Sequence, residues 1–151
     1  MSTIIIAEAG VNHNGDISIA HKLIDAAVNA GADIIKFQTF KSSNLASQSA
    51  PKARYQLLLT EDKENQQKML KNLELPEESY YELIKHCEEA NIEFLTTAFD
   101  FKSLQLIKRF NLKRNKIPSG EITNLPFLRQ IAEMKLPIIL STGMSSLVEV
   151  E

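Results

Sequence analysis

Polar side chains suited to catalysis or ligand binding follow five short apolar runs of this chain, each time at the C-terminal end of the run. The five segments are TIIIAEAG (3–10), ADIIKFQTF (32–40), IEFLTTAF (92–99), NKIPSGE (115–121) and PIILSTGM (137–144). Parallel strands of β/α enzymes end at one rim, and the active site lies at that rim. We therefore expect these polar groups to converge, which predicts an active site without specifying its reaction.

Glu8 and Lys36 are the two charged candidates inside apolar runs. Glu8 precedes Ala9-Gly10, and its carboxylate is a candidate acid, base or acceptor for a sugar hydroxyl. Lys36 lies within a run typical of a buried parallel strand, where an ammonium group requires an anionic or carbonyl partner. It is a candidate for binding phosphate or carboxylate, or for forming a Schiff base. The structural alternative is an internal ion pair with Glu8 or Glu121.

Alternation along the second run predicts which side chains accompany Lys36. A period of two sends Gln38 and Ile34 to the same face as Lys36, and Phe37 to the opposite face. Gln38 is thereby a candidate binding residue beside Lys36.

The remaining runs end in hydroxyl, aromatic and carboxylate side chains. Thr97 and Phe99 end the third run, and Ser119 and Glu121 end the fourth. Ser119 and Glu121 would share one side if their strand continues that far. Ser141-Thr142-Gly143 ends the fifth run, where hydroxyls and a glycine amide are suited to holding an anion.

Histidine and cysteine give weaker signals. The segment Asn12-His13-Asn14-Gly15 is suited to binding a polyol or phosphate, and Asn-Gly is equally ordinary turn chemistry. His21 and His86 lie in helical patterns and are predicted to be surface residues. Cys87 has helical spacing with apolar neighbours, which predicts a packed thiol rather than a nucleophile.

Strand-like and helix-like segments alternate along most of the chain. Predicted strands begin near residues 4, 32, 92, 113 and 138, with helical patterns between them, including one opened by Asp16 and one running from Asn124 to Lys135. This α/β repeat fits either a five-stranded open flavodoxin-like sheet or the first five units of a (β/α)8 TIM barrel, which needs ~250 residues. The end of the chain, inside the start of a helix, favours the barrel.

Residues 41–75 interrupt this repeat. A serine-rich loop at 42–50 is followed by helix-like sequence at 52–55 and 61–73. An insertion of this length after the C-terminal end of a strand is usually functional.

Composition restricts the class of protein. The chain has 151 residues, 44% of them hydrophobic and 24% charged, with a net charge of −2 and one cysteine. These values are ordinary for one globular domain in a reducing cytoplasm, and they favour neither nucleic acid nor a membrane as partner. The sequence contains no HExxH motif, cysteine pair or Asp-rich loop, so it presents no complete metal-ligand set.

Six strings in this order resemble the sialic acid synthase family, which makes N-acetylneuraminate and the related legionaminic and pseudaminic acids. They are AEAGVNHNG, KFQTF, APKARYQ, LTTAF, KIPSGEITNLP and ILSTGM. The resemblance implies a (β/α)8 barrel followed by a small antifreeze-like domain, with residues 1–151 forming the N-terminal portion of the barrel. It also implies a homodimer that condenses phosphoenolpyruvate with an N-acetylated hexosamine and releases phosphate.

The resemblance also implies roles for individual residues. Lys36, Thr97 and Ser119 match positions that contact phosphoenolpyruvate. Gln38, Phe99 and Glu121 match positions that line the amino-sugar site. Glu8 matches a strand-one glutamate near the metal and the sugar, and we expect Glu8 or Glu121 to transfer protons or to orient the attacking water.

The family's divalent metal, Mn²⁺ or Mg²⁺, is bound by histidines of later barrel strands, and no metal ligand is expected in residues 1–151. We therefore expect this chain alone to be inactive, with strands one and five as open edges that expose apolar side chains. Two rival functions remain from the residues themselves. One is a Schiff-base aldolase that uses Lys36, and the other is a non-catalytic protein that binds phosphorylated ligands.

Overall fold

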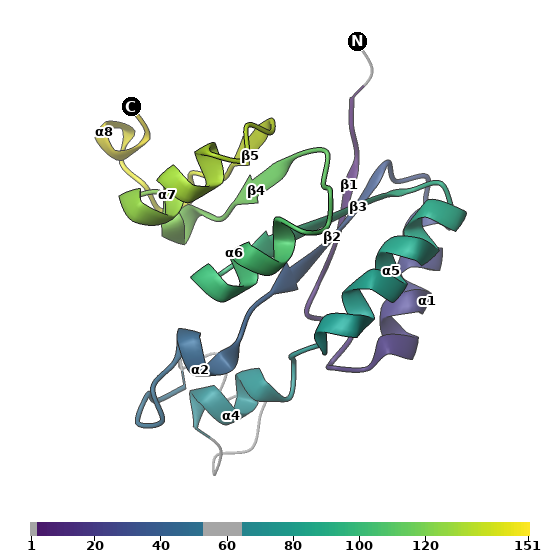
Figure 1. The fold of residues 1–151 in the computed structure, drawn as a ribbon, viewed down its shortest axis with the longest axis horizontal. Helices are drawn as coiled ribbons and strands as arrows, with labels where there is room; N and C mark the ends of the chain where they lie inside the picture. Colours follow the sequence, from purple (N-terminus) through teal and green to yellow (C-terminus); the bar gives the residue numbers. More distant parts are fainter. Residues whose placement is uncertain (1–2, 53–64) are drawn as a thin grey trace.

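Strands and helices alternate along the chain in the computed structural model, which describes residues 3–52 and 65–151 (Figure 1). In chain order the elements are β1 (Ile6–Gly10), α1 (Ile17–Asn29), β2 (Ile34–Thr39), α2 (Ser42–Leu45), α4 (Gln66–Lys71), α5 (Glu77–Glu89), β3 (Glu93–Ala98), α6 (Phe101–Ile107), β4 (Asn115–Ile117), η1 (Ser119–Glu121), α7 (Leu125–Ala132), β5 (Ile138–Leu140) and α8 (Leu147–Val150). The α/β prediction is confirmed.

The strands are parallel and form two ladders rather than one continuous sheet. One ladder has the order β1-β2-β3, and the other joins β4 to β5. The register of the first ladder pairs Glu8 with Lys36 and Gln38 with Thr97, so these candidates lie on neighbouring strands near one end of the sheet. β4 lies beside β3.

The start of the first strand differs from the prediction. β1 begins at Ile6, and Ile4 and Ile5 are 50% and 53% exposed rather than buried on both faces. Among the residues that the structure describes, β1 pairs only with β2, so one of its sides lacks a neighbouring strand. β4 ends at Ile117, and the chain turns through Pro118 into η1. The strand does not continue to Ser119 and Glu121, so the condition under which these two side chains would share one side is not met.

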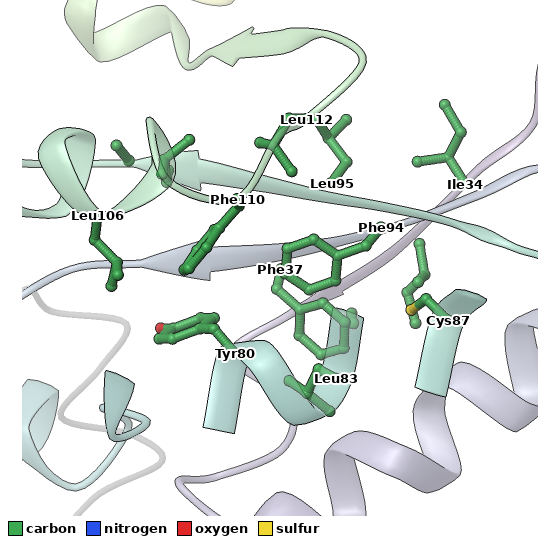
Figure 2. Close-up of a cluster of buried hydrophobic side chains, with 14 of the residues drawn as sticks. Ile34, Phe37, Tyr80, Leu83, Cys87, Phe94, Leu95, Leu106, Phe110 and Leu112 are labelled. Carbon is green, nitrogen blue, oxygen red and sulfur yellow. The ribbon is translucent and has the colours of Figure 1, made fainter. Parts of the chain in front are cut away.

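The main apolar core lies between the three-stranded sheet and α5. Phe37 and Phe94 stack with ring centroids 5.7 Å apart, and Figure 2 shows both rings directed from the sheet toward Leu83 and Cys87. Burial raises the pKa of the Cys87 thiol to about 12. The predicted direction of Phe37 and the predicted packed thiol are both confirmed.

Polar caps begin the helices where the sequence predicted them. The Asp16 carboxylate accepts the amide of Ser18 at 2.7 Å at the start of α1, and the Asn124 side chain accepts the amide of Phe127 at the start of α7. The helix predicted at 61–73 is α4, which spans only Gln66–Lys71, and residues 53–64 of the insertion lie outside the described residues. In the described stretches, no helix is long and apolar enough to cross a membrane.

Both outer strands have open edges, as expected for an unclosed barrel. β1 and β5 each pair on one side only. Ile138 and Leu140 of β5 are 47% and 41% exposed. The barrel is not closed by residues 3–52 and 65–151.

Gly15 connects the loop after β1 to the end of the insertion. Its φ is +76°, and a Cβ placed there would lie 2.5 Å from the carbonyl oxygen of Asn72. Gly31 has nearly the same φ, +75°, and a Cβ placed there would meet no atom within 4 Å. The two glycines thus share a left-handed φ and differ in their surroundings.

We expect Gly15→Ala to destabilise the protein clearly more than Gly31→Ala. The left-handed backbone conformation costs an alanine about 1–2 kcal/mol at either position, and only alanine at position 15 also clashes with backbone. Urea unfolding of both variants measures the difference. Equal losses of stability would show that the loop and residue 72 are not in the contact described here.

Candidate active site

An ion pair between β1 and β2 forms the centre of the candidate site. The Lys36 Nζ lies 2.5 Å from the Glu8 Oε2 and donates to the Thr97 Oγ1 of β3 at 3.5 Å. Lys36 is only 9% exposed, whereas the Glu8 side chain is 53% exposed. The buried ammonium group thus has the anionic partner that its burial requires. That partner is Glu8, one of the two carboxylates that the sequence offered for an internal ion pair with Lys36.

Gln38 lies next to this pair, across Gly10. A Cβ added to Gly10 would lie 3.4 Å from the Glu8 Oε1 and 3.5 Å from the Gln38 Nε2. The absence of a side chain at Gly10 therefore leaves room for the Glu8 and Gln38 head groups beside the backbone. The structure brings together Glu8, Lys36, Gln38 and Thr97, as the sequence pattern predicted.

Lys116 of β4 is a second ammonium group near this centre; it lies in the run NKIPSGE but was not among the predicted site residues. Its Nζ donates to the Ile117 carbonyl oxygen at 2.7 Å and to the Ser141 Oγ at 2.6 Å. Burial lowers the pKa of Lys116, the charge of Lys36 lowers it further, and Glu8 opposes both effects. Ile117 is 3% exposed in the core, so the alternation argument applied to Lys36 would also have placed Lys116 on the site's face.

The ends of β4 and β5 also meet at this rim. A Cβ added to Gly143 would lie 3.6 Å from the Ser119 Oγ, and Ser141 already accepts the Lys116 ammonium. The Ser141 hydroxyl therefore contacts Lys116, and the candidate Ser119 lies beside Gly143, two residues further along the chain than Ser141.

Glu121 and Phe99 occupy a neighbouring region. The Glu121 Oε2 accepts the Asn124 Nδ2 at 2.6 Å. Phe99 and Asn124 both line a hollow beyond the ends of β3 and β4, together with Asn44, Asp100, Phe101, Lys102 and Phe127. The described contacts do not join Glu121 or Phe99 to the Glu8–Lys36 pair. The predicted residues thus form a charged cluster and an adjacent aromatic hollow.

His13 lies below the rim rather than at it. Its Nδ1 accepts the amide of Gly15 at 3.0 Å, and its ring lies 6.1 Å from that of Phe37, on the helix side of the sheet. The side chain is buried, and burial lowers the pKa of His13. Among the described residues, its Nε2 has no hydrogen-bond partner. A packing role for His13 under the first loop fits these contacts better than a ligand role.

The other two histidines pack between helices. His21 of α1 and His86 of α5 have ring centroids 4.5 Å apart, and each bonds a carboxylate of the opposite helix at 2.8 Å. Their side chains are 24% and 29% exposed, so the prediction of surface residues is correct only in part.

The charged cluster is suited to a small, multiply charged anion. Lys36 and Lys116 supply two cations, and Thr97, Ser119 and Ser141 supply hydroxyl groups. Residues 3–52 and 65–151 contain no group of three or more histidine, cysteine or carboxylate side chains that could hold a metal ion.

Comparisons with known proteins show which family and which named proteins the chain resembles. A family model described as the NeuB family matches residues 23–151. The N,N'-diacetyllegionaminic acid synthase of Campylobacter jejuni is 54% identical over 149 residues, which are 99% of this chain and 45% of that protein. The synthase of the same name from Legionella pneumophila is 49% identical, over 99% of this chain and 42% of its own length.

A solved structure agrees with these relatives. The N-acetylneuraminic acid synthetase of Leptospira borgpetersenii, crystallised with citrate, superposes with a TM-score of 0.79 at 32% identity, covering 98% of this chain and 48% of that one. The chain thus spans less than half the length of these relatives. Since the family model covers most of the chain, the chain belongs to the NeuB family.

Proposed function

We propose that this chain is the N-terminal part of a (β/α)8 synthase of sialic-acid type. The enzyme would condense phosphoenolpyruvate with an N-acetylated amino sugar, giving a nine-carbon acid and phosphate. Support comes from the names of the two similar synthases and from the parallel strands whose C-terminal ends carry the charged cluster.

The two ammonium groups, Lys36 and Lys116, are the observation that carries the proposal. Phosphoenolpyruvate has a carboxylate and a phosphate on the same small framework, so its recognition calls for more than one cation with hydroxyl donors between them. Lys36 from β2 and Lys116 from β4 approach from opposite sides of β3, whose Thr97 hydroxyl already contacts Lys36. Glu8 pairs with the Lys36 ammonium group in the free site, and an anionic group of the substrate would share this pairing once it is bound.

The proposed reaction balances without any redox partner. The methylene carbon of phosphoenolpyruvate attacks the aldehyde carbon of the open-chain sugar, forming a C–C bond and an alkoxide that takes a proton. The adjacent carbon becomes an oxocarbenium ion, to which water adds with loss of a proton. The resulting tetrahedral intermediate breaks its bond to the bridging oxygen and releases phosphate, leaving a 2-keto acid.

Glu8 and Glu121 are the carboxylates available for these proton transfers. Glu8 is half-exposed beside Lys36, where a carboxylate can accept a proton from water that attacks a neighbouring bound substrate. Glu121 is oriented by Asn124 beside the aromatic hollow, where we place the amino sugar, with Gln38 and Phe99 as further contacts. A divalent metal ion held by residues outside this chain would polarise the aldehyde.

A phosphate-release assay on the full-length protein tests the proposal. N-acetylmannosamine and di-N-acetylated bacillosamine-derived sugars would be supplied in turn with phosphoenolpyruvate and Mn²⁺. Phosphate release that depends on one of these sugars is expected. A covalent adduct on Lys36 after borohydride treatment with pyruvate, without phosphate release, would support the aldolase instead, and binding of phosphoenolpyruvate without turnover would support a binding protein.

A further inference from the structure

The carboxylate of Asp100 connects the exits of two neighbouring strands. Asp100 follows Phe99 directly after β3 and is 8% exposed. Its Oδ2 accepts the backbone amide of Lys41, just after β2, at 2.9 Å, and its Oδ1 accepts the Nδ2 of Asn44 in α2 at 3.0 Å. One side chain thus holds the chain that leaves β2 against the chain that leaves β3.

The bond between the Lys41 amide and the Asp100 carboxylate lies where the backbone ladder of β2 and β3 ends. The last backbone bond between the two strands joins the Phe99 amide to the Thr39 carbonyl at 3.2 Å. In a parallel ladder the next donor is the amide of Lys41, and here it bonds the Asp100 carboxylate instead of a backbone carbonyl. The carboxylate therefore extends the pairing of β2 and β3 beyond their last regular residues.

Asp100 has a second role, in capping α6, that is separate from its bonds to the chain after β2. It caps α6, because its Oδ1 accepts the Ser103 amide at 3.0 Å and its Oδ2 accepts the Ser103 hydroxyl at 2.6 Å. Burial by itself would raise the pKa of Asp100, but the bonds from Ser103, Lys41 and Asn44 together lower it. The group is therefore an ionised, fully engaged acceptor at neutral pH.

The residues that Asp100 holds belong to the region where we place the amino sugar. Asp100 and Asn44 line the aromatic hollow together with Phe99. Gln38 lies three residues before Lys41, on the strand whose exit the carboxylate holds. A change in the spacing of the two exits would move Gln38 and Phe99 relative to each other, while Lys36, deeper in β2 and paired with Glu8, would stay in place.

We propose that Asp100 is a positioning residue, which fixes the exits of β2 and β3 relative to each other and thereby orients the amino-sugar side of the site. The inference rests on the proposed function and adds a determinant of sugar affinity that is distinct from phosphoenolpyruvate binding.

Asp100→Ser in the full-length protein separates the two tasks. Serine is also a good helix cap, but its hydroxyl is too short to reach residues 41 and 44. We expect the KM for the amino sugar to rise about tenfold or more, as for loss of a charge-assisted bond, while the KM for phosphoenolpyruvate changes by less than about twofold. Asp100→Asn, which keeps the size and one acceptor, should raise the same KM less.

Ser103→Ala is the matched control, because it removes a partner of the same carboxylate on the α6 side only. It should lower the melting temperature and leave both KM values within about twofold of the unaltered protein. An unchanged sugar KM in both Asp100 variants, or an equal rise of both KM values, would overturn the positioning role. Failure of the unaltered protein to release phosphate with any amino sugar would instead overturn the proposed function, and the positioning role with it.

Discussion

Replacing Lys36 with alanine is expected to reduce kcat/KM for phosphoenolpyruvate by about a thousandfold or more, since preorganised charge at the reacting group usually contributes more to catalysis than any other effect. Lys36 is nearly buried and supplies its charge at the centre of the cluster, where water screens it little. Steady-state phosphate release from the full-length protein measures the effect. Folding should persist, because the Glu8 partner left behind is half-exposed and regains water.

Lys85→Ala serves as the matched control for this variant. Lys85 lies on α5, its side chain is 76% exposed, and it pairs with Glu89 at 3.7 Å. Its replacement should leave kcat/KM unchanged within about twofold, since exposed ion pairs contribute little. A Lys36→Ala enzyme with substantial remaining turnover would show that the buried ammonium is a structural partner of Glu8 and no part of the phosphoenolpyruvate site.

Lys116→Met is expected to raise the KM for phosphoenolpyruvate by about 10- to 100-fold, as for loss of one charge-assisted hydrogen bond. The pH profile gives a second, independent readout. The pKa of Lys116 is lowered chiefly by burial and then by Lys36, so this lysine loses its charge at a lower pH than an exposed lysine. Because the anion needs the charged form, kcat/KM should fall as pH rises through that lowered pKa.

Lys116→Arg tests the assignment of that fall. Arginine stays protonated throughout the range of enzyme assays, so the alkaline fall in kcat/KM should move to higher pH, even if the bulkier group lowers the maximum. An alkaline limb that stays at the same pH in this variant would assign the titration to another group and contradict the role of Lys116.

Local patterns predicted much of the structure because the forces behind them are local. The alternation of apolar and polar residues correctly placed Lys36 toward the site and Phe37 toward α5. The apolar run at 138–140 is β5, and Asp16 caps α1 through its own side chain. Each of these results depends on residues close in sequence.

The boundary that failed depends on contacts outside its own segment. Ile4 and Ile5 have the composition of a buried strand, but the edge position of β1 leaves them half-exposed. The polar residues that follow the fourth strand form η1 at Ser119–Glu121.

The site was predicted in outline and missed in two particulars. Lys116 lies within its strand, as Lys36 does, but the fourth run was represented among the candidates only by Ser119 and Glu121 at its polar end. The bridge made by Asp100 joins residues 56 and 59 positions apart, and no local pattern indicates such a contact. The sequence therefore indicates the side chains that we propose contact the substrates more readily than the residues that position those side chains.

The fate of the bridging oxygen of phosphoenolpyruvate tests the central claim most directly. The full-length protein would be supplied with phosphoenolpyruvate carrying ¹⁸O in the C–O–P bridge, together with the amino sugar that supports turnover. The proposed mechanism breaks the C–O bond, so mass spectrometry should find the ¹⁸O in the released phosphate and none of it in the nine-carbon acid. Label retained in the acid, or loss of phosphate without formation of a C–C bond, would contradict the account.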